Sequence, residues 1–164
     1  MENVGVSALL TASEAARAIR TGQLSAIEIV EAQLGRIEKF NPALNAIVTL
    51  DADNARCHAR EADRALATGE AWGPLHGVPI TLKDSFNTAG LRTTSGYRPF
   101  RGRVPVEDAT PVARLREAGA IILGKTNLPS LANGLQTNNA LFGRTNNPWD
   151  LRRTPGGSSG VSSP

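Results

Sequence analysis

The chain has 164 residues and a formal net charge of +3, with 40% hydrophobic and 20% charged residues. These proportions are ordinary for a globular protein, and no apolar run reaches the ~18 residues of a membrane span, so no membrane-spanning helix is expected. The arginines are scattered among glutamates, and no basic stripe carries interleaved aromatic residues, so nucleic-acid binding is not expected.

Residues 1–70 are predicted to form a layer of helices. Thr11-Ala-Ser-Glu14 has the pattern of a capping box, and the helix that it opens should end at Gly22. Ser25-Ala-Ile-Glu28 repeats the pattern, and the second helix should end before Pro42. Its apolar stripe has helical spacing and consists of Ile27, Val30, Leu34 and Ile37.

A short strand over 46–50 and an alanine-rich helix over 53–67 complete this layer. The helix contains Cys57, the only cysteine, so neither a disulfide nor a cysteine metal site is predicted. The two histidines, His58 and His76, lack metal-ligand spacing, and no cofactor is expected. The first residues lack the basic segment of a signal peptide, which makes a reducing cytoplasm the expected compartment.

Residues 71–164 are predicted to form an α/β core. Two short apolar runs, 78–82 and 120–123, are bounded by proline or glycine, as buried strands are. Thr110-Pro111 opens a helix between them, so strand, helix and strand alternate. From Asn127 onward the chain is mostly loop, with at most one short helix.

Two of the three lysines, Lys83 and Lys125, end these apolar runs. A lysine carried inward by a strand loses solvation, which lowers its pKa, and a lysine base needs a lowered pKa. The alternative is an ammonium group that reaches water from the strand end while its stem stays buried. Spacing alone leaves both interpretations open.

Thr154-Pro-Gly-Gly-Ser-Ser-Gly160 places paired serines between glycines. Glycine allows the backbone to approach closely, and successive N–H groups in such a loop can hold an oxyanion. A flexible linker is the alternative, because glycine–serine runs often serve as one. The loop matches G-x-S-x-G, but residues 150–155 before it do not form a strand, so a nucleophile elbow is not predicted.

Read together, three segments resemble the amidase signature family. Gly73-Pro-Leu-His-Gly-Val-Pro-Ile-Thr-Leu-Lys83-Asp84 looks like the lysine strand of the family, and residues 108–127 look like its following helix and strand. Phe142-Gly-Arg-Thr-Asn-Asn-Pro-Trp-Asp150 leads into the serine–glycine loop, as in the family. The resemblance implies an α/β fold with a mixed β-sheet core covered by helices, here a single domain that stops before its C-terminal half.

The resemblance further implies an amidase that hydrolyses a carboxamide C–N bond through a Ser-cisSer-Lys triad and an acyl-enzyme. By motif match, Lys83 is the general base, Ser158 is the bridging serine, and the peptide bond from Ser158 to Ser159 is cis. The residues expected to line one side of the substrate site are Gly134, Leu135, Gln136 and Thr137. The expected partner is a small-molecule amide, and a homodimer of a longer parent fits the resemblance.

The third triad residue, the nucleophile, lies in the family in a second Gly-Gly-Ser segment that these 164 residues lack. The chain is therefore expected to be inactive alone and marginally stable, and Val161 and Pro164 depart from the family pattern. A glutaminase-type subunit of a tRNA-dependent amidotransferase and a non-catalytic remnant are the alternatives. Leu135 and Gln136 stand where such a subunit is expected to have small hydroxyl residues, which favours a stand-alone amidase.

Overall fold

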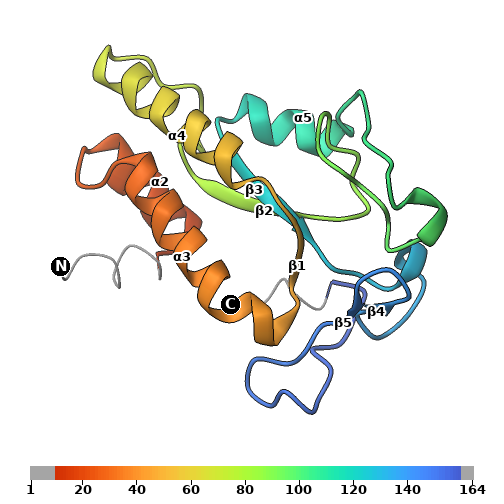
Figure 1. Cartoon of the computed structure of the whole chain (residues 1–164). Helices are drawn as coiled ribbons and strands as arrows, with labels where there is room; N and C mark the ends of the chain where they lie inside the picture. The colour runs from red at the N-terminus through yellow and green to blue at the C-terminus, as the bar shows by residue number, and fades with distance from the viewer. Residues whose placement is uncertain (1–9, 160–164) are drawn as a thin grey trace. The chain divides into compact units, whose positions relative to one another are not determined.

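A computed structural model describes residues 10–159 of the chain. The predicted departures at Val161 and Pro164 lie outside the described residues. The elements in chain order are α2 (Ala12–Arg20), α3 (Ala26–Leu44), β1 (Ile47–Leu50), α4 (Ala52–Ala67), β2 (Pro79–Lys83), η1 (Arg98–Phe100), α5 (Thr110–Glu117), β3 (Ile121–Thr126), η2 (Ser130–Ala132), β4 (Asn138–Asn139) and β5 (Gly143–Arg144) (Figure 1). Within residues 10–159, no helix is both long and apolar enough to cross a membrane.

Contacts divide the chain into two compact units. The first comprises Met1–Ile37, Asp51–Ile80 and Ala113–Leu123. The second comprises Glu38–Leu50, Thr81–Val112 and Gly124–Pro164. Both units draw on separate stretches of the chain, whereas the predicted division after residue 70 follows chain order and stays a prediction.

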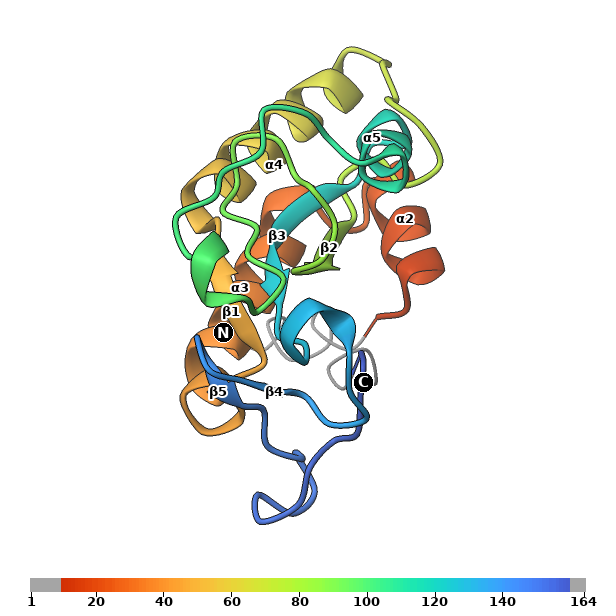
Figure 2. The same cartoon turned by 90° about the vertical axis from the view of Figure 1, so that its right-hand side faces the viewer.

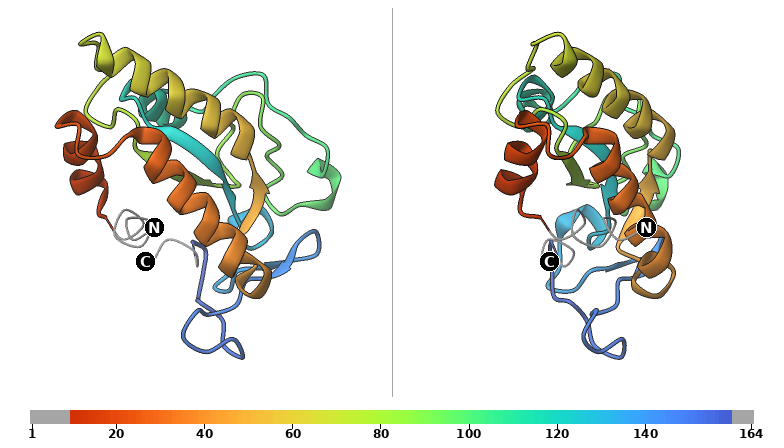
Figure 3. Two further views of the ribbon diagram at one scale, coloured as in Figure 1. Left: turned by 60° about the vertical axis from the view of Figure 1, so that its left-hand side comes forward. Right: turned by 90° about the vertical axis from the view of Figure 1, so that its left-hand side faces the viewer.

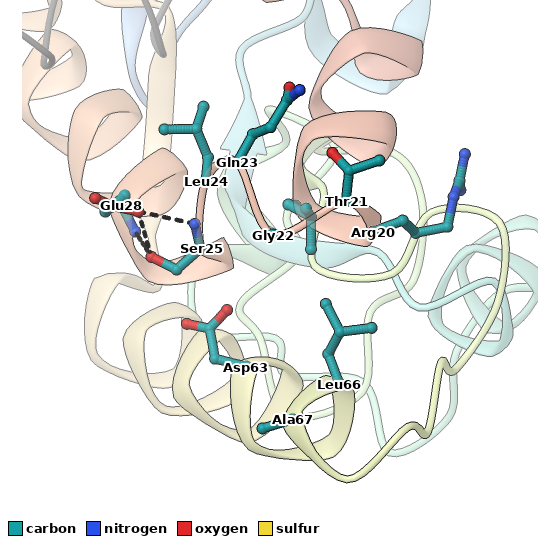
Figure 4. Close-up of a pocket in the computed structure, with 11 residues that line it drawn as sticks. Arg20, Thr21, Gly22, Gln23, Leu24, Ser25, Glu28, Asp63, Leu66 and Ala67 are labelled. Atoms are coloured by element: carbon teal, nitrogen blue, oxygen red, sulfur yellow. Dashed lines mark hydrogen bonds between the residues drawn. The ribbon is translucent and has the colours of Figure 1, made fainter.

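Both predicted capping boxes are present. The Glu14 N–H donates to the Thr11 hydroxyl at 3.3 Å, and the Glu14 carboxylate accepts the Thr11 N–H at 2.8 Å. Ser25 and Glu28 make the same pair of bonds at the start of α3 (Figure 4). Because these bonds favour the ionised carboxylates, they hold the pKa of Glu14 and of Glu28 below the usual value.

The start of α3 has a second cap, which comes from a distant part of the chain. The Asp63 carboxylate on α4 accepts the N–H groups of Ala26 and Ile27 at 2.6 and 3.1 Å. Further along, Arg56 of α4 pairs with Glu31 of α3 at 2.8 Å, so the two helices lie side by side in opposite directions (Figure 3). A carboxylate at a helix N-terminus satisfies free N–H groups and opposes the positive end of the helix dipole.

The prediction that the second helix ends before Pro42 was wrong, because α3 continues to Leu44. Asn41 holds the last turn in place. Its carbonyl oxygen accepts the N–H of Asn45 at 2.7 Å, and its side-chain oxygen accepts the N–H groups of Ala46 and Ile47 at 2.8 Å each. These bonds compensate for the hydrogen bond that a proline removes near a helix end.

The hydrophobic core of the first unit lies where small side chains of its helices meet the strands. Ala55, Ala59 and Ala62 of α4 are fully buried there, with Ile121 of β3 almost so. His76 is buried as well. The Trp72 N–H donates to its Nδ1 at 3.0 Å, so the proton is on Nε2, which donates to the Ala62 carbonyl at 3.0 Å. His76 therefore has a packing role.

The main sheet has the strand order β1-β3-β2, and its strands are not all parallel. β1 pairs with β3 in the antiparallel sense. β2 and β3 run in the same direction, because Val78 accepts the N–H of Ile121 and Asp84 donates to Thr126 further along both strands. The mixed sheet confirms the predicted α/β fold. In the second unit, β4 and β5 form a small separate antiparallel pair (Figure 2).

Candidate functional site

Lys83 and Ser158 lie together in the second unit, although 75 residues separate them in the sequence. Lys83 is the last residue of β2, between the buried side chains of Leu82 and Asp84. Its Nζ donates a hydrogen bond to Ser158 Oγ at 2.8 Å. Burial lowers the pKa of Lys83 below its usual value. A lysine with a lowered pKa beside a hydroxyl can exchange a proton with it.

The serine–glycine loop contains one cis peptide bond, which joins Gly157 to Ser158. The prediction of a cis bond between Ser158 and Ser159 was therefore wrong by one position. The residue before the cis bond is a glycine for a steric reason. A Cβ at Gly157 would lie 2.7 Å from the carbonyl carbon of Leu135 and 2.8 Å from the amide nitrogen of Gln136. The loop thus packs directly on the backbone of residues 135–136.

The four residues predicted to line the substrate site fall into two groups. Gly134, Leu135 and Gln136 are exposed beside the loop, and Leu135 is 89% exposed. Their contact with substrate stays a prediction. Thr137 is fully buried, and both its N–H and its hydroxyl donate to the Gly156 carbonyl at 2.9 Å. Its side chain supports the loop from behind.

Lys125 is not part of this contact. It is fully buried, and its ammonium group donates to the Phe86 carbonyl and to the hydroxyls of Thr88 and Thr93. Three acceptors satisfy the three donors of an ammonium group. Lys125 therefore matches neither alternative left open by the sequence. Its ammonium group does not reach water, and its hydrogen bonds fix the chain between residues 86 and 93 instead of serving a proton-accepting base.

Burial lowers the pKa of Lys125 from 10.5 to about 8, against the attraction of Asp84 and Asp108. Between these two values the unfolded chain holds a proton that the folded chain has released, so Lys125 should make the free energy of unfolding rise with pH across this window. Guanidinium titrations below pH 8 and up to pH 10.5, with Lys125→Met for comparison, measure the effect. A stability difference between the two proteins that stays constant with pH would contradict it.

Asp84, directly after the proposed base, was missed by the sequence argument. It is fully buried and accepts the Thr94 hydroxyl at 2.5 Å and the Thr94 N–H at 3.2 Å. Burial raises its pKa, although these bonds and the charge of Lys125 act in the opposite direction. The available signal was an acidic residue at the end of an apolar strand, next to a lysine.

Residues 10–159 hold no group of three or more side chains that could bind a metal ion. A hollow of about 580 Å³ in the first unit is lined by residues that include Arg20, Leu24 and Asp63 (Figure 4). It contains none of the predicted site residues, and Asp63 there already caps α3.

Comparison with known proteins gives consistent matches along almost the whole chain. The model of a family described as Amidase matches residues 28–163. The A subunit of glutamyl-tRNA(Gln) amidotransferase from Acidothermus cellulolyticus is 50% identical over 152 residues, which are 93% of this chain and 30% of that protein. Its counterpart from Streptomyces coelicolor is 46% identical over 154 residues, 94% of this chain and 31% of that protein.

Solved structures match as well. A fatty acid amide hydrolase superposes with a TM-score of 0.92 at 30% identity, covering 98% of this chain and 28% of that one. The peptide amidase from Stenotrophomonas maltophilia superposes with a TM-score of 0.88 at 37% identity, covering 94% of this chain and 33% of that one. This chain spans about 30% of the length of the curated relatives that it matches.

Proposed function

The chain belongs to the amidase signature family, and from this premise we propose that it supplies the base and the bridging serine of a site that hydrolyses carboxamide C–N bonds. The observation that carries the proposal is the 2.8 Å contact between Lys83 Nζ and Ser158 Oγ. The whole protein, at the length of its relatives, is proposed to add the nucleophile and the rest of the substrate site.

The proposed mechanism is a proton relay with two transfers, from the attacking serine to Ser158 and from Ser158 to Lys83. Neutral Lys83 accepts the proton of the Ser158 hydroxyl, while Ser158 Oγ takes the proton of the attacking serine. The attacking oxygen bonds to the amide carbon, and when the C–N bond breaks the amine leaves with the proton returned through Ser158. Water then hydrolyses the acyl-enzyme along the same route. The lowered pKa of Lys83 supports this role, because more of the lysine is neutral at a given pH.

A stand-alone amidase and one component of an amidotransferase complex are both candidates for the whole protein. The first is favoured by Leu135 and Gln136 at the edge of the site, where the family resemblance implies small hydroxyl residues in an amidotransferase component. The second is favoured by the 50% identity to the A subunit of a glutamyl-tRNA(Gln) amidotransferase. The two candidates share the chemistry of Lys83 and Ser158 and differ in what surrounds it.

Ammonia release tests the proposal and separates the candidates. The 164-residue polypeptide should release none from any carboxamide, because it contains no second Gly-Gly-Ser segment. The whole protein should release ammonia, and Ser158→Ala should abolish the release. Activity on simple carboxamides without partner chains supports the stand-alone amidase, and activity on glutamine only with partner chains supports the amidotransferase component. Undiminished ammonia release by the Ser158→Ala variant of the whole protein would contradict the proposal.

A further inference from the structure

We propose that Thr137 is the positioning residue of this site, holding the serine–glycine loop so that Ser158 Oγ faces Lys83 Nζ. This inference rests on the proposed function, because it assigns a role within the same pair. It concerns only residues of the second unit. Thr137 is proposed to act through the loop that carries Ser158, to which both of its hydrogen-bond donors are directed.

The loop needs an anchor because it has no regular secondary structure of its own. Residues 154–159 form neither helix nor strand. Two residues before Ser158, the Gly156 carbonyl accepts two hydrogen bonds at 2.9 Å, one from the Thr137 N–H and one from the Thr137 hydroxyl. A carbonyl oxygen has two lone pairs, so a single residue occupies both. The loop is thereby fixed in position and in orientation.

Thr137 is itself held rigidly, which makes it a usable anchor. Its side chain is fully buried, and its own carbonyl accepts the N–H of Thr145 at 2.9 Å. The pair β4–β5 follows it directly, and the Asn139 side chain there accepts the N–H groups of Leu141 and Phe142. The backbone just before Thr137 also lies against Gly157. Residues 135–137 therefore form a platform on which the loop rests.

The hydroxyl of Thr137, rather than its backbone, is the part that substitution can remove. Valine has nearly the same shape, so Thr137→Val keeps the N–H bond to Gly156 and loses the hydroxyl bond. Serine keeps the hydroxyl. Thr145→Val is a matched control, because Thr145 is 2% exposed and its hydroxyl bonds to Asn45 and Asn127 rather than to Gly156. It donates to the Asn45 carbonyl at 2.7 Å and accepts from the Asn127 side chain at 3.0 Å. Thr145→Val measures how far the loss of a buried hydroxyl by itself changes the NMR signal of Lys83.

The experiment follows the side-chain amine of Lys83 by NMR in the 164-residue chain, labelled at the ε-carbon of lysine. The chain has three lysines, so single substitutions assign each signal. Ser158→Ala should change the shift of the Lys83 signal and its titration with pH. Thr137→Val should reproduce most of that change, with the titration moving to higher pH because Lys83 regains solvent. Thr137→Ser and Thr145→Val should leave the Lys83 signal as it is in the unchanged chain.

Each outcome decides one question. If Ser158→Ala leaves the Lys83 signal unchanged, the contact is absent and the proposed function fails. If Ser158→Ala changes the signal and Thr137→Val does not, only the positioning role is overturned. If Thr137→Val and Thr137→Ala both unfold the chain while Thr145→Val does not, the positioning role is also overturned, because Thr137 would then hold the fold as a whole.

Discussion

In the whole protein, Lys83→Met is expected to lower kcat for amide hydrolysis by about 100-fold to 10,000-fold, the usual contribution of a general base. Methionine has similar length and cannot accept a proton. The KM should change far less, because Lys83 bonds to Ser158 and the proposed role is proton transfer rather than substrate binding. Steady-state kinetics with a carboxamide that the unchanged protein hydrolyses would measure both constants.

Lys83→Arg separates a base from a positive charge. Arginine keeps the charge but does not lose its proton in proteins, so it should be as inactive as methionine. Lys39→Met is the matched control, because Lys39 is exposed and lies over the ring of Phe40, and it should leave kcat unchanged. If Lys83→Arg kept more than about a tenth of the activity, the requirement would be for charge, and the proposed base would be wrong.

The pH profile gives an independent check of the same assignment. A base must be neutral to accept a proton, so kcat/KM of the unchanged protein should rise with pH until Lys83 is deprotonated. Burial lowers the pKa of Lys83, which places this rise at a lower pH than for an ordinary lysine. The rise should be absent from the residual activity of Lys83→Met.

Local patterns allowed several features to be predicted from the sequence. The caps at Thr11 and Ser25 depend on a glutamate three residues later, so a short window contains the whole interaction. The strands that contain Lys83 and Lys125, β2 and β3, were likewise visible as short apolar runs. In both cases the residues that decide the structure are neighbours in the chain.

Features that depend on distant residues could not be predicted in this way. Asp63 caps a helix whose first residue lies 37 positions earlier, and nothing near Asp63 indicates its partner. The sequence pattern alone could not separate Lys83 from Lys125, because both follow short apolar runs. In the structure Lys125 is fully buried among three acceptors, whereas Lys83 is partly buried and contacts Ser158 Oγ. Only the resemblance to a family, and no local pattern, paired Lys83 with Ser158 in the sequence.

The support of the serine–glycine loop by Thr137 is another feature that depends on residues distant in the sequence. The expectation that Thr137 lines the substrate site, together with Gly134, Leu135 and Gln136, came from the resemblance to the family alone. In the structure Leu135 and Gln136 are exposed. Thr137 is buried because the Gly156 carbonyl, 19 residues later, takes up both of its donors. Alternation between exposed and buried positions within one segment depends on what packs behind it, and that partner is not local.

Asp84→Ala is expected to lower the free energy of unfolding by about 3 kcal/mol, as breaking a buried charged network does. Alanine leaves the Thr94 N–H and hydroxyl without their acceptor and leaves the buried charge of Lys125 with less compensation. Guanidinium titration followed by circular dichroism measures the change. Asp84→Asn should fall between the two proteins, because one of its atoms still accepts while the other presents a donor to Thr94.

The matched control for this substitution is Asp53→Ala. Asp53 is an aspartate in the first turn of α4. Its side chain is fully exposed, and its ion pair with Arg56 is long, at 3.6 Å. Exposed pairs of this kind, and an exposed carboxylate in the first turn of a helix, contribute little, so the substitution should change the free energy of unfolding far less than Asp84→Ala does. If Asp84→Ala were as mild as Asp53→Ala, the cluster of Asp84, Thr94 and Lys125 would not fix the chain that follows Lys83. The position of the base would then depend on β2 and the serine loop alone.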